Sequence, residues 1–171
     1  HGLTDFLGYE HERAKGTILA ILSEGDQVTE AAEGRLVEVF LDRTPFYAEG
    51  GGQIGDQGTI REAGGGSELF QVEDTQRPVG GLVVHRGTLH GRVRVGETVA
   101  ATVDPARRAD TMRNHTGTHL LHWASRKVLG EHVKQQGSHV DPDRLRSDFS
   151  HYEPLTPEQA GAVAGHLLGE A

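Results

Sequence analysis

The chain has 171 residues, no cysteine, 24 glycines and a formal net charge of −8. Its length suits one ordinary domain or two small ones. The absence of cysteine excludes disulfides and cysteine-based zinc sites within these residues. The negative charge argues against strong nonspecific nucleic-acid binding, which needs surplus Lys and Arg. No signal-like or membrane-spanning run is present, so a cytoplasmic protein is expected, and a first residue other than Met suggests an excised chain.

The first hundred residues predict short strands separated by glycine-rich turns. A polar, helix-like stretch begins at Leu3 and is followed by an apolar run over residues 17–22. Alternating apolar side chains then predict strands over residues 35–41, 69–73, 81–89 and 97–103. Strands of this length and spacing indicate a small β-barrel or sandwich.

Helical periodicity replaces this pattern after Pro105. A long helix is predicted over residues 107–129, and Gly130 is a suitable helix stop. Strands are predicted over residues 133–140 and 145–149, joined by turn residues.

A final helix is predicted to begin with Thr156 as its N-cap and Pro157 at its first position. The expected fold class is therefore α+β. We expect a β domain over residues 1–104 and the opening part of an α+β domain over residues 105–171.

Two histidines in the long helix form a candidate metal site. His115 and His119 are four residues apart, so both side chains project from one helix face. Zinc needs three or four ligands, and further candidates are His122, His132, His139 and His151. Alternatively, one histidine packs in the core while the other is solvated. Thr116 occupies the place of the glutamate in HExxH, which argues against a zinc protease.

Longer motifs surround this pair. The run TPFYAEGGGQIGDQG, from Thr44 to Gly58, resembles the glycine-rich motif of alanyl-tRNA synthetases and their free-standing editing relatives. The run NHTGTHLLH, from Asn114 to His122, resembles the start of the same enzymes' editing domain, as do residues 128–138 and 148–151. The opening segment looks more like the bacterial synthetases than the short editors.

The resemblance implies a small glycine-rich β-barrel followed by the helix-on-antiparallel-sheet start of the alanyl/threonyl-tRNA editing domain. Such ligases charge tRNA(Ala) using ATP and Mg²⁺, in an aminoacylation domain that is not expected here. Their editing domains hydrolyse seryl- and glycyl-tRNA(Ala). The expected partner of the parent enzyme is the acceptor end of tRNA(Ala), and the chain itself is expected to be monomeric.

The resemblance also implies site residues. His115 and His119 match the first half of the editing zinc site, while its second half, a CxxxH pair, has no counterpart in these residues. Gln135 matches a glutamine associated with selectivity. The glycine-rich loop beside the pocket adds Thr44, Gly50, Gly51, Gly52 and Gln53 as candidates, and we take Thr44, Gly51, Gln53 and Gln135 as the catalytic set.

Three functions remain open. The first is an editing-hydrolase fragment that is inactive alone, because its zinc site is incomplete. The second is a tRNA-binding module that uses basic side chains, which equally fit a solvated face: Arg107, Arg108, Arg113, Arg126, Lys127 and Lys134. The third is an engineered, truncated folding unit without activity.

Three polar residues stand where the family usually has apolar ones: Ser125, His139 and Ser147. Our hypothesis is that they lie on faces that pack against a missing part of the editing domain, where polar side chains keep the fragment soluble. Natural divergence with compensating repacking is the alternative.

Overall fold

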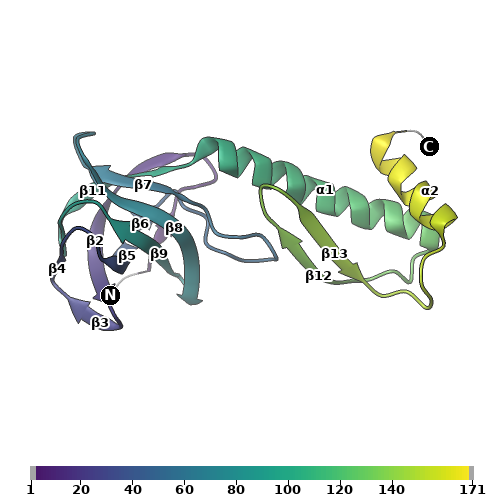
Figure 1. The fold of residues 1–171 in the computed structure, drawn as a ribbon, viewed down its shortest axis with the longest axis horizontal. Helices are drawn as coiled ribbons and strands as arrows, with labels where there is room; N and C mark the ends of the chain where they lie inside the picture. The colour runs from purple at the N-terminus through teal and green to yellow at the C-terminus, as the bar shows by residue number, and fades with distance from the viewer. Residues whose placement is uncertain (1–2, 170–171) are drawn as a thin grey trace. The chain divides into compact units, whose positions relative to one another are not determined.

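The computed structural model describes residues 3–169, and the chain falls into two compact units. One unit contains the residues up to 50 together with 54–108, and the other contains 51–53 together with the residues from 109 onward. The first is a closed β-barrel and the second carries a helix on a two-stranded sheet (Figure 1). The predicted α+β class, a barrel followed by a helix on an antiparallel sheet, is confirmed.

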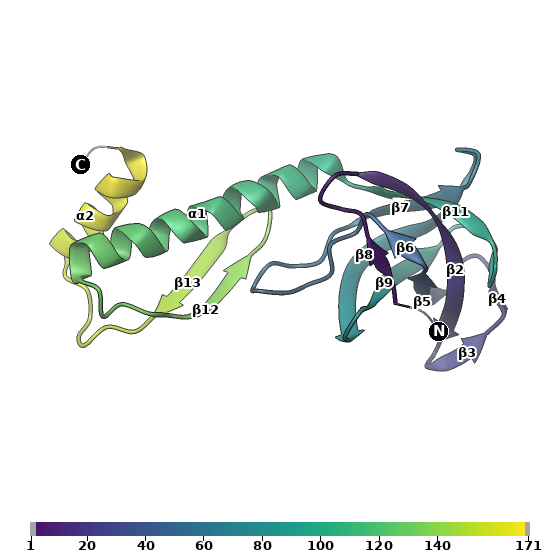
Figure 2. The ribbon, with the colours of Figure 1, turned by 180° about the vertical axis from the view of Figure 1, so that it is seen from behind.

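The barrel is an antiparallel sheet that closes on itself. Its strands are β2 (Arg13–Ser23), β3 (Asp26–Val28), β5 (Leu36–Leu41), β7 (Gly58–Glu62), β8 (Glu68–Val79), β9 (Leu82–Leu89) and β11 (Thr98–Val103). They are ordered β11-β7-β8-β9-β5-β2-β3, and an additional pairing of β11 with β2 closes the ring, leaving β3 outside it. Figure 2 shows the ring from behind. Closure removes the exposed strand edges that an open sheet would present.

Four two-residue strands add smaller pairings around the ring. β1 (Asp5–Phe6) pairs in parallel with β6 (Arg43–Thr44), and β4 (Glu30–Ala31) pairs antiparallel with β10 (Val93–Arg94).

Alternation along the strands fills the barrel. Val99, Ala101 and Val103 of β11 are at most 1% exposed, while the residues between them are half-buried. Phe46 and Phe70 are completely buried in the same core. Inward side chains therefore form one apolar interior, as the period-two pattern requires.

The predicted strands over 35–41, 69–73, 81–89 and 97–103 are all present. The helix-like stretch from Leu3 is wrong, because residues 5–6 are a short strand and β2 starts at Arg13. β1 pairs with β6, and the N–H groups of Asp5 and Leu7 donate to the carbonyls of Asp42 and Thr44 at 2.8 Å. These pairings with a distant strand outweigh the local polar pattern.

The long helix α1 (Pro105–Leu129) begins two residues earlier than predicted. The Asp104 carboxylate accepts hydrogen bonds from the backbone N–H groups of Ala106 and Arg107, both at 3.0 Å. This caps the first turn, whose N–H groups have no partner within the helix. Gly130 ends the helix as predicted, with φ at 110°, a left-handed conformation that glycine tolerates.

The second unit continues with a hairpin and a short helix, in the predicted order. β12 (Gln135–Val140) pairs antiparallel with β13 (Leu145–Phe149) and lies along α1 (Figures 1 and 2). α2 (Pro157–Leu168) begins with a capping box in which Thr156 and Gln159 bond each other's backbone. Trp123 of α1 meets His166 of α2 edge-on, with ring centroids 5.7 Å apart.

The solubility hypothesis for the three polar departures fails at Ser125, which is 1% exposed and buried within the chain itself. A side chain that water does not reach cannot make the surface more soluble. Ser147 and His139 are half-buried, and His139 Nε2 lies 3.0 Å from an oxygen of the Asp141 carboxylate. His139 thus has a local partner in the hairpin turn.

One buried histidine links the barrel core to the glycine-rich motif. His85 is completely buried, with Nδ1 2.9 Å from the Val39 carbonyl oxygen and Nε2 2.7 Å from the Thr44 hydroxyl oxygen. Neutral imidazole satisfies both contacts, donating from Nδ1 and accepting at Nε2. Burial lowers the pKa of His85 from 6.5 to about 4, against a smaller opposing effect of the hydrogen bond to Val39.

Acid should therefore destabilise the barrel through His85. Between pH 6.5 and about 4 the unfolded chain binds a proton that the folded chain excludes, so the free energy of unfolding falls as pH falls. The lowered pKa corresponds to about 3 kcal/mol at the acid end of this window. Urea unfolding across the window should show a steeper loss in wild type than in His85→Gln. The exposed His90→Gln is the control, and parallel curves for wild type and His85→Gln would contradict the expectation.

Candidate functional site

The glycine-rich segment is held at its base by Tyr47 and Asp56. The Tyr47 N–H donates to the Asp56 carboxylate at 2.7 Å, and the Asp56 N–H donates to the Tyr47 carbonyl at 2.9 Å. The Tyr47 hydroxyl donates to the Gly50 carbonyl at 3.1 Å. Thr44, a predicted catalytic residue, is completely buried in the barrel unit and bonded to His85.

A buried ion pair fixes the same base. The Arg108 guanidinium binds the Asp56 carboxylate and donates to the carbonyls of Pro45 at 2.6 Å and Gly8 at 3.1 Å. The two charged side chains are only 11% and 6% exposed. Arg108 is thus a structural residue, since its guanidinium is nearly inaccessible and is bonded to three groups within the chain. Its predicted use as an exposed tRNA contact is wrong.

Residues 51–53, at the tip of the loop, belong to the unit that contains the histidine helix. Gln53 forms an isolated parallel β-bridge with Val140, whose N–H donates to the Gly52 carbonyl at 2.7 Å. Ser138 donates its hydroxyl to the Gly51 carbonyl at 3.3 Å. The loop tip is therefore hydrogen-bonded to strand β12 through its backbone.

The side chain of Gln53 reaches the first histidine of the motif. Its Oε1 atom lies 2.6 Å from His115 Nδ1. An amide oxygen only accepts, so Nδ1 carries the proton and the lone pair of the neutral ring is on Nε2. His115 is half-buried and His119 exposed, with ring centroids 5.0 Å apart and planes inclined by 41°. The predicted alignment of the two rings on one helix face is present.

The two imidazoles suit zinc as partial ligands. Zinc binds neutral imidazole nitrogen, and its histidine ligands usually donate their other N–H to an oxygen, as His115 does to Gln53. Across residues 3–169, however, no group of three His, Cys, Asp or Glu side chains is arranged to hold a metal. The donor set within the described chain is thus two ligands, fewer than zinc requires.

The other candidate histidines have different surroundings. His132 Nε2 lies 2.8 Å from His151 Nδ1, and the His132 ring stacks on the Tyr152 ring with centroids 4.5 Å apart. His139 contacts Asp141. His122 Nδ1 is buried and has no hydrogen-bond partner within the described chain. None of these supplies a third ligand to His115 and His119 in this structure of residues 3–169.

Gln135 is not adjacent to the loop tip. It is exposed and begins β12, whereas the bridge to Gln53 is at Val140, the last residue of that strand. Five strand positions separate them by about 16 Å. The structure therefore brings together Gly51, Gln53, His115 and His119 but places Gln135 at the far end of the strand.

Sequence reasoning missed two residues that shape this site. Ser138 packs against Gly52, and Asn114 donates to the carbonyls of Asp141 at 2.8 Å and Pro142 at 3.1 Å. Asn114 thereby ties α1 to the hairpin turn one residue before His115. A polar residue next to the HxxxH pair was the available signal, but its partner is 27 residues away.

Comparison with known proteins gives the family. Residues 1–107 match the family model of class II (A) tRNA synthetases, which is more than half of the chain. The chain belongs to the class II (A) tRNA synthetases.

Three relatives of this synthetase chain are alanine–tRNA ligases. That of Chloroflexus aurantiacus is 51% identical over 163 residues, and that of Thermus thermophilus is 54% identical over 163 residues; each match covers 95% of the chain. That of Roseiflexus castenholzii is 54% identical over 91% of the chain. The chain spans only 17–18% of the length of these relatives. No helix among residues 3–169 is long and apolar enough to cross a membrane.

The docking of the loop tip predicts unequal effects of two glycine substitutions. Gly52 has φ at 84°, and an added Cβ would lie 2.6 Å from the Ser138 carbonyl oxygen. Gly51 has φ at 60° and open space around it. Both Gly→Ala changes strain the backbone by about 1–2 kcal/mol, but only Gly52→Ala pushes against β12. We expect Gly52→Ala to reduce the hydrogen-exchange protection of the Val140 N–H about tenfold more than Gly51→Ala. Equal protection in the two variants would contradict this docking.

Proposed function

We propose that this chain is part of the editing region of an alanine–tRNA ligase that hydrolyses seryl- and glycyl-tRNA(Ala). The observation that carries the proposal is the hydrogen bond from His115 Nδ1 to Gln53 Oε1. It joins the glycine-rich loop to the HxxxH helix at one place. The alanine–tRNA ligase relatives cover nearly the whole chain, which supports the same assignment. The proposed setting is the cytoplasm, with the acceptor end of tRNA(Ala) as the partner.

The proposed roles follow from the side chains. His115 and His119 would hold a zinc ion, which when bound polarises water or binds the substrate amine. Gln53 fixes the His115 ring and leaves Nε2 free as the ligating atom. Gly51 has open space where a side chain would stand, so its backbone can approach a substrate closely.

Selectivity for serine fits a polar pocket. A site that hydrogen-bonds the seryl hydroxyl rejects alanine, because its polar groups would then lose their partner. On the resemblance alone, we keep Gln135 as a candidate selectivity residue and Thr44 as a candidate catalytic residue. Thr44 is buried beside His85 in the barrel unit, and Gln135 lies at the opposite end of β12 from the loop tip.

We further propose that the 171 residues alone do not turn over substrate. They contain no cysteine and supply two of the three or four ligands that zinc requires, so the other ligands would come from residues outside them. ATP and Mg²⁺ belong to aminoacylation, which these residues would not perform.

Hydrolysis of seryl-tRNA(Ala) tests the assignment. In a ligase that contains this segment, His115→Ala and His119→Ala should each reduce deacylation at least about a hundredfold and leave alanine charging unchanged. His90→Ala on the barrel is the matched control. The chain by itself, with added zinc, should show no turnover above background. Unchanged deacylation in both helix variants would refute the editing role, and turnover by the chain alone would refute its incompleteness.

The positioning role of Gln53 has a separate readout. In Gln53→Ala the His115 ring loses its acceptor, so ¹⁵N NMR should show a mixture of ring tautomers in place of protonated Nδ1. Zinc affinity of the ligase should fall about 10- to 100-fold, as for other outer-sphere partners. Gln53→Glu keeps an acceptor oxygen and should preserve the Nδ1 proton. An unchanged tautomer in Gln53→Ala would show that Gln53 does not position the ring.

A further inference from the structure

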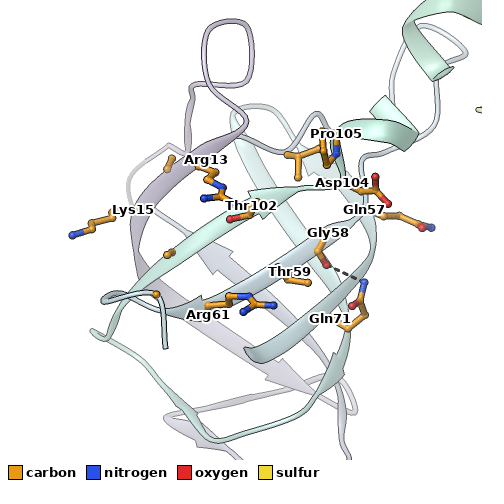
Figure 3. Close-up of a pocket in the computed structure, with 14 residues that line it drawn as sticks. Arg13, Lys15, Gln57, Gly58, Thr59, Arg61, Gln71, Thr102, Asp104 and Pro105 are labelled. Atoms are coloured by element: carbon orange, nitrogen blue, oxygen red, sulfur yellow. Dashed lines mark hydrogen bonds between the residues drawn. The ribbon is translucent and has the colours of Figure 1, made fainter. Parts of the chain in front are cut away.

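A basic hollow lies on the outer surface of the barrel, over strands β2, β11 and β7 (Figure 3). It has a volume of about 860 Å³. Arg13, Lys15 and Arg61 are its charged walls, and Asp104 lies at the rim near the start of α1. All of its lining residues belong to the barrel unit.

Strand register explains the shape. Lys15 is opposite Ala100, which is opposite Arg61 on the other side, so two basic residues flank a small one. In the neighbouring outward row, Arg13 is opposite Thr102, which is opposite Thr59. Outward residues two apart on a strand share a face. The middle strand therefore forms a low floor between long cationic side chains.

The charges of the hollow are largely free. Arg13 and Lys15 are exposed and have no ion pair within residues 3–169. Arg61 shares a surface ion pair with Glu68 at 3.3 Å, and such exposed pairs hold weakly. The carboxylate of Asp104 is engaged in capping α1. The hollow is thus a positive surface in a chain whose net charge is −8.

Uncharged donors lie between the cations. Arg13 is beside the Thr102 row, and the hydroxyls of Thr59 and Thr102 make no side-chain hydrogen bond within the described chain. Gln71, by contrast, already donates to the Gly58 carbonyl at 3.0 Å (Figure 3). Cations together with hydroxyls are typical of contacts to nucleic-acid phosphates.

We propose that this hollow binds the sugar-phosphate backbone of tRNA. Lys15 and Arg61 are separated by two strand spacings, about 10 Å, and Arg13 is displaced from Lys15 by about 7 Å along β2. Cations spread over these distances fit a chain of successive phosphates better than one small anion. The surface reads charge and not sequence, so it would hold the tRNA while the editing site selects the amino acid. This proposal rests on the proposed function, because tRNA is its ligand.

Binding of a tRNA(Ala) transcript to the chain, measured by fluorescence anisotropy over a series of salt concentrations, tests the proposal. Arg13→Gln/Lys15→Gln should weaken binding about tenfold and lower the salt slope by about two. Arg35→Gln/Arg92→Gln is the matched control: it removes the same charge from exposed barrel residues that do not line the hollow. This control should bind as wild type does. Circular dichroism would confirm that both double variants fold.

Each other outcome overturns the proposal. Equal weakening in the two double variants would mean that net charge alone matters, and unchanged binding in both would mean that tRNA lies elsewhere. If the wild-type chain does not bind tRNA at low salt, tRNA is not the ligand of the hollow. Binding to anionic lipid vesicles that depends on Arg13 and Lys15, with tRNA binding unaffected, would assign the hollow to a membrane surface. Editing is judged separately, by deacylation in the His115 and His119 variants, so the two proposals can fail independently.

Discussion

The backbone pairing of Gly52 and Gln53 with Val140 is the constraint on which the candidate site depends. The Val140 N–H donates to the Gly52 carbonyl at 2.7 Å, and this orders the loop tip on the last residue of β12. Only then does the Gln53 side chain reach His115. Without the backbone pair, the loop would have to lose conformational entropy for a single side-chain hydrogen bond. One such bond stabilises the loop by less than ordering it costs. The bridge supplies order before any metal or substrate arrives.

The barrel contributes a stable base for the glycine-rich segment. Asp56 and Arg108 neutralise each other where both are nearly inaccessible, and each also bonds a backbone group, the Tyr47 N–H for Asp56 and the Pro45 carbonyl for Arg108. Removing one partner alone would leave an uncompensated buried charge. Thr44 and His85 serve the same end with neutral groups, since one tautomer of His85 satisfies both of its contacts. The glycine-rich segment therefore contains structural residues, such as Thr44 and Asp56, as well as Gln53, which contacts His115 in the candidate site.

The sequence predicted well where a local pattern and the tertiary structure agree. Alternation identified β5 and β11, and the capping residues of α2 were read directly from Thr156 and Pro157. It failed for the segment before Arg13, because β1 pairs with β6 and Thr4 donates its N–H to the Gly81 carbonyl, contacts with residues that are distant in the chain. The spacing of His115 and His119 gave their shared face, but no spacing could show that Gln53, 62 residues away, bonds the ring. Burial of Ser125 and Arg108 likewise depends on packing that a linear pattern does not contain.

Closure of the barrel by β2 and β11 has a consequence for synthesis. Residues 13–17 of β2 pair with residues 98–102 of β11, so the ring cannot close until β11 is present. Pairings of large sequence separation form slowly because loop-closure entropy opposes them. During translation the edge of β2 stays open until Val103 has left the ribosome, and α1 is the next segment to emerge. The nascent chain therefore leaves residues 13–17 of β2 without their β11 partners for most of the time needed to make the barrel.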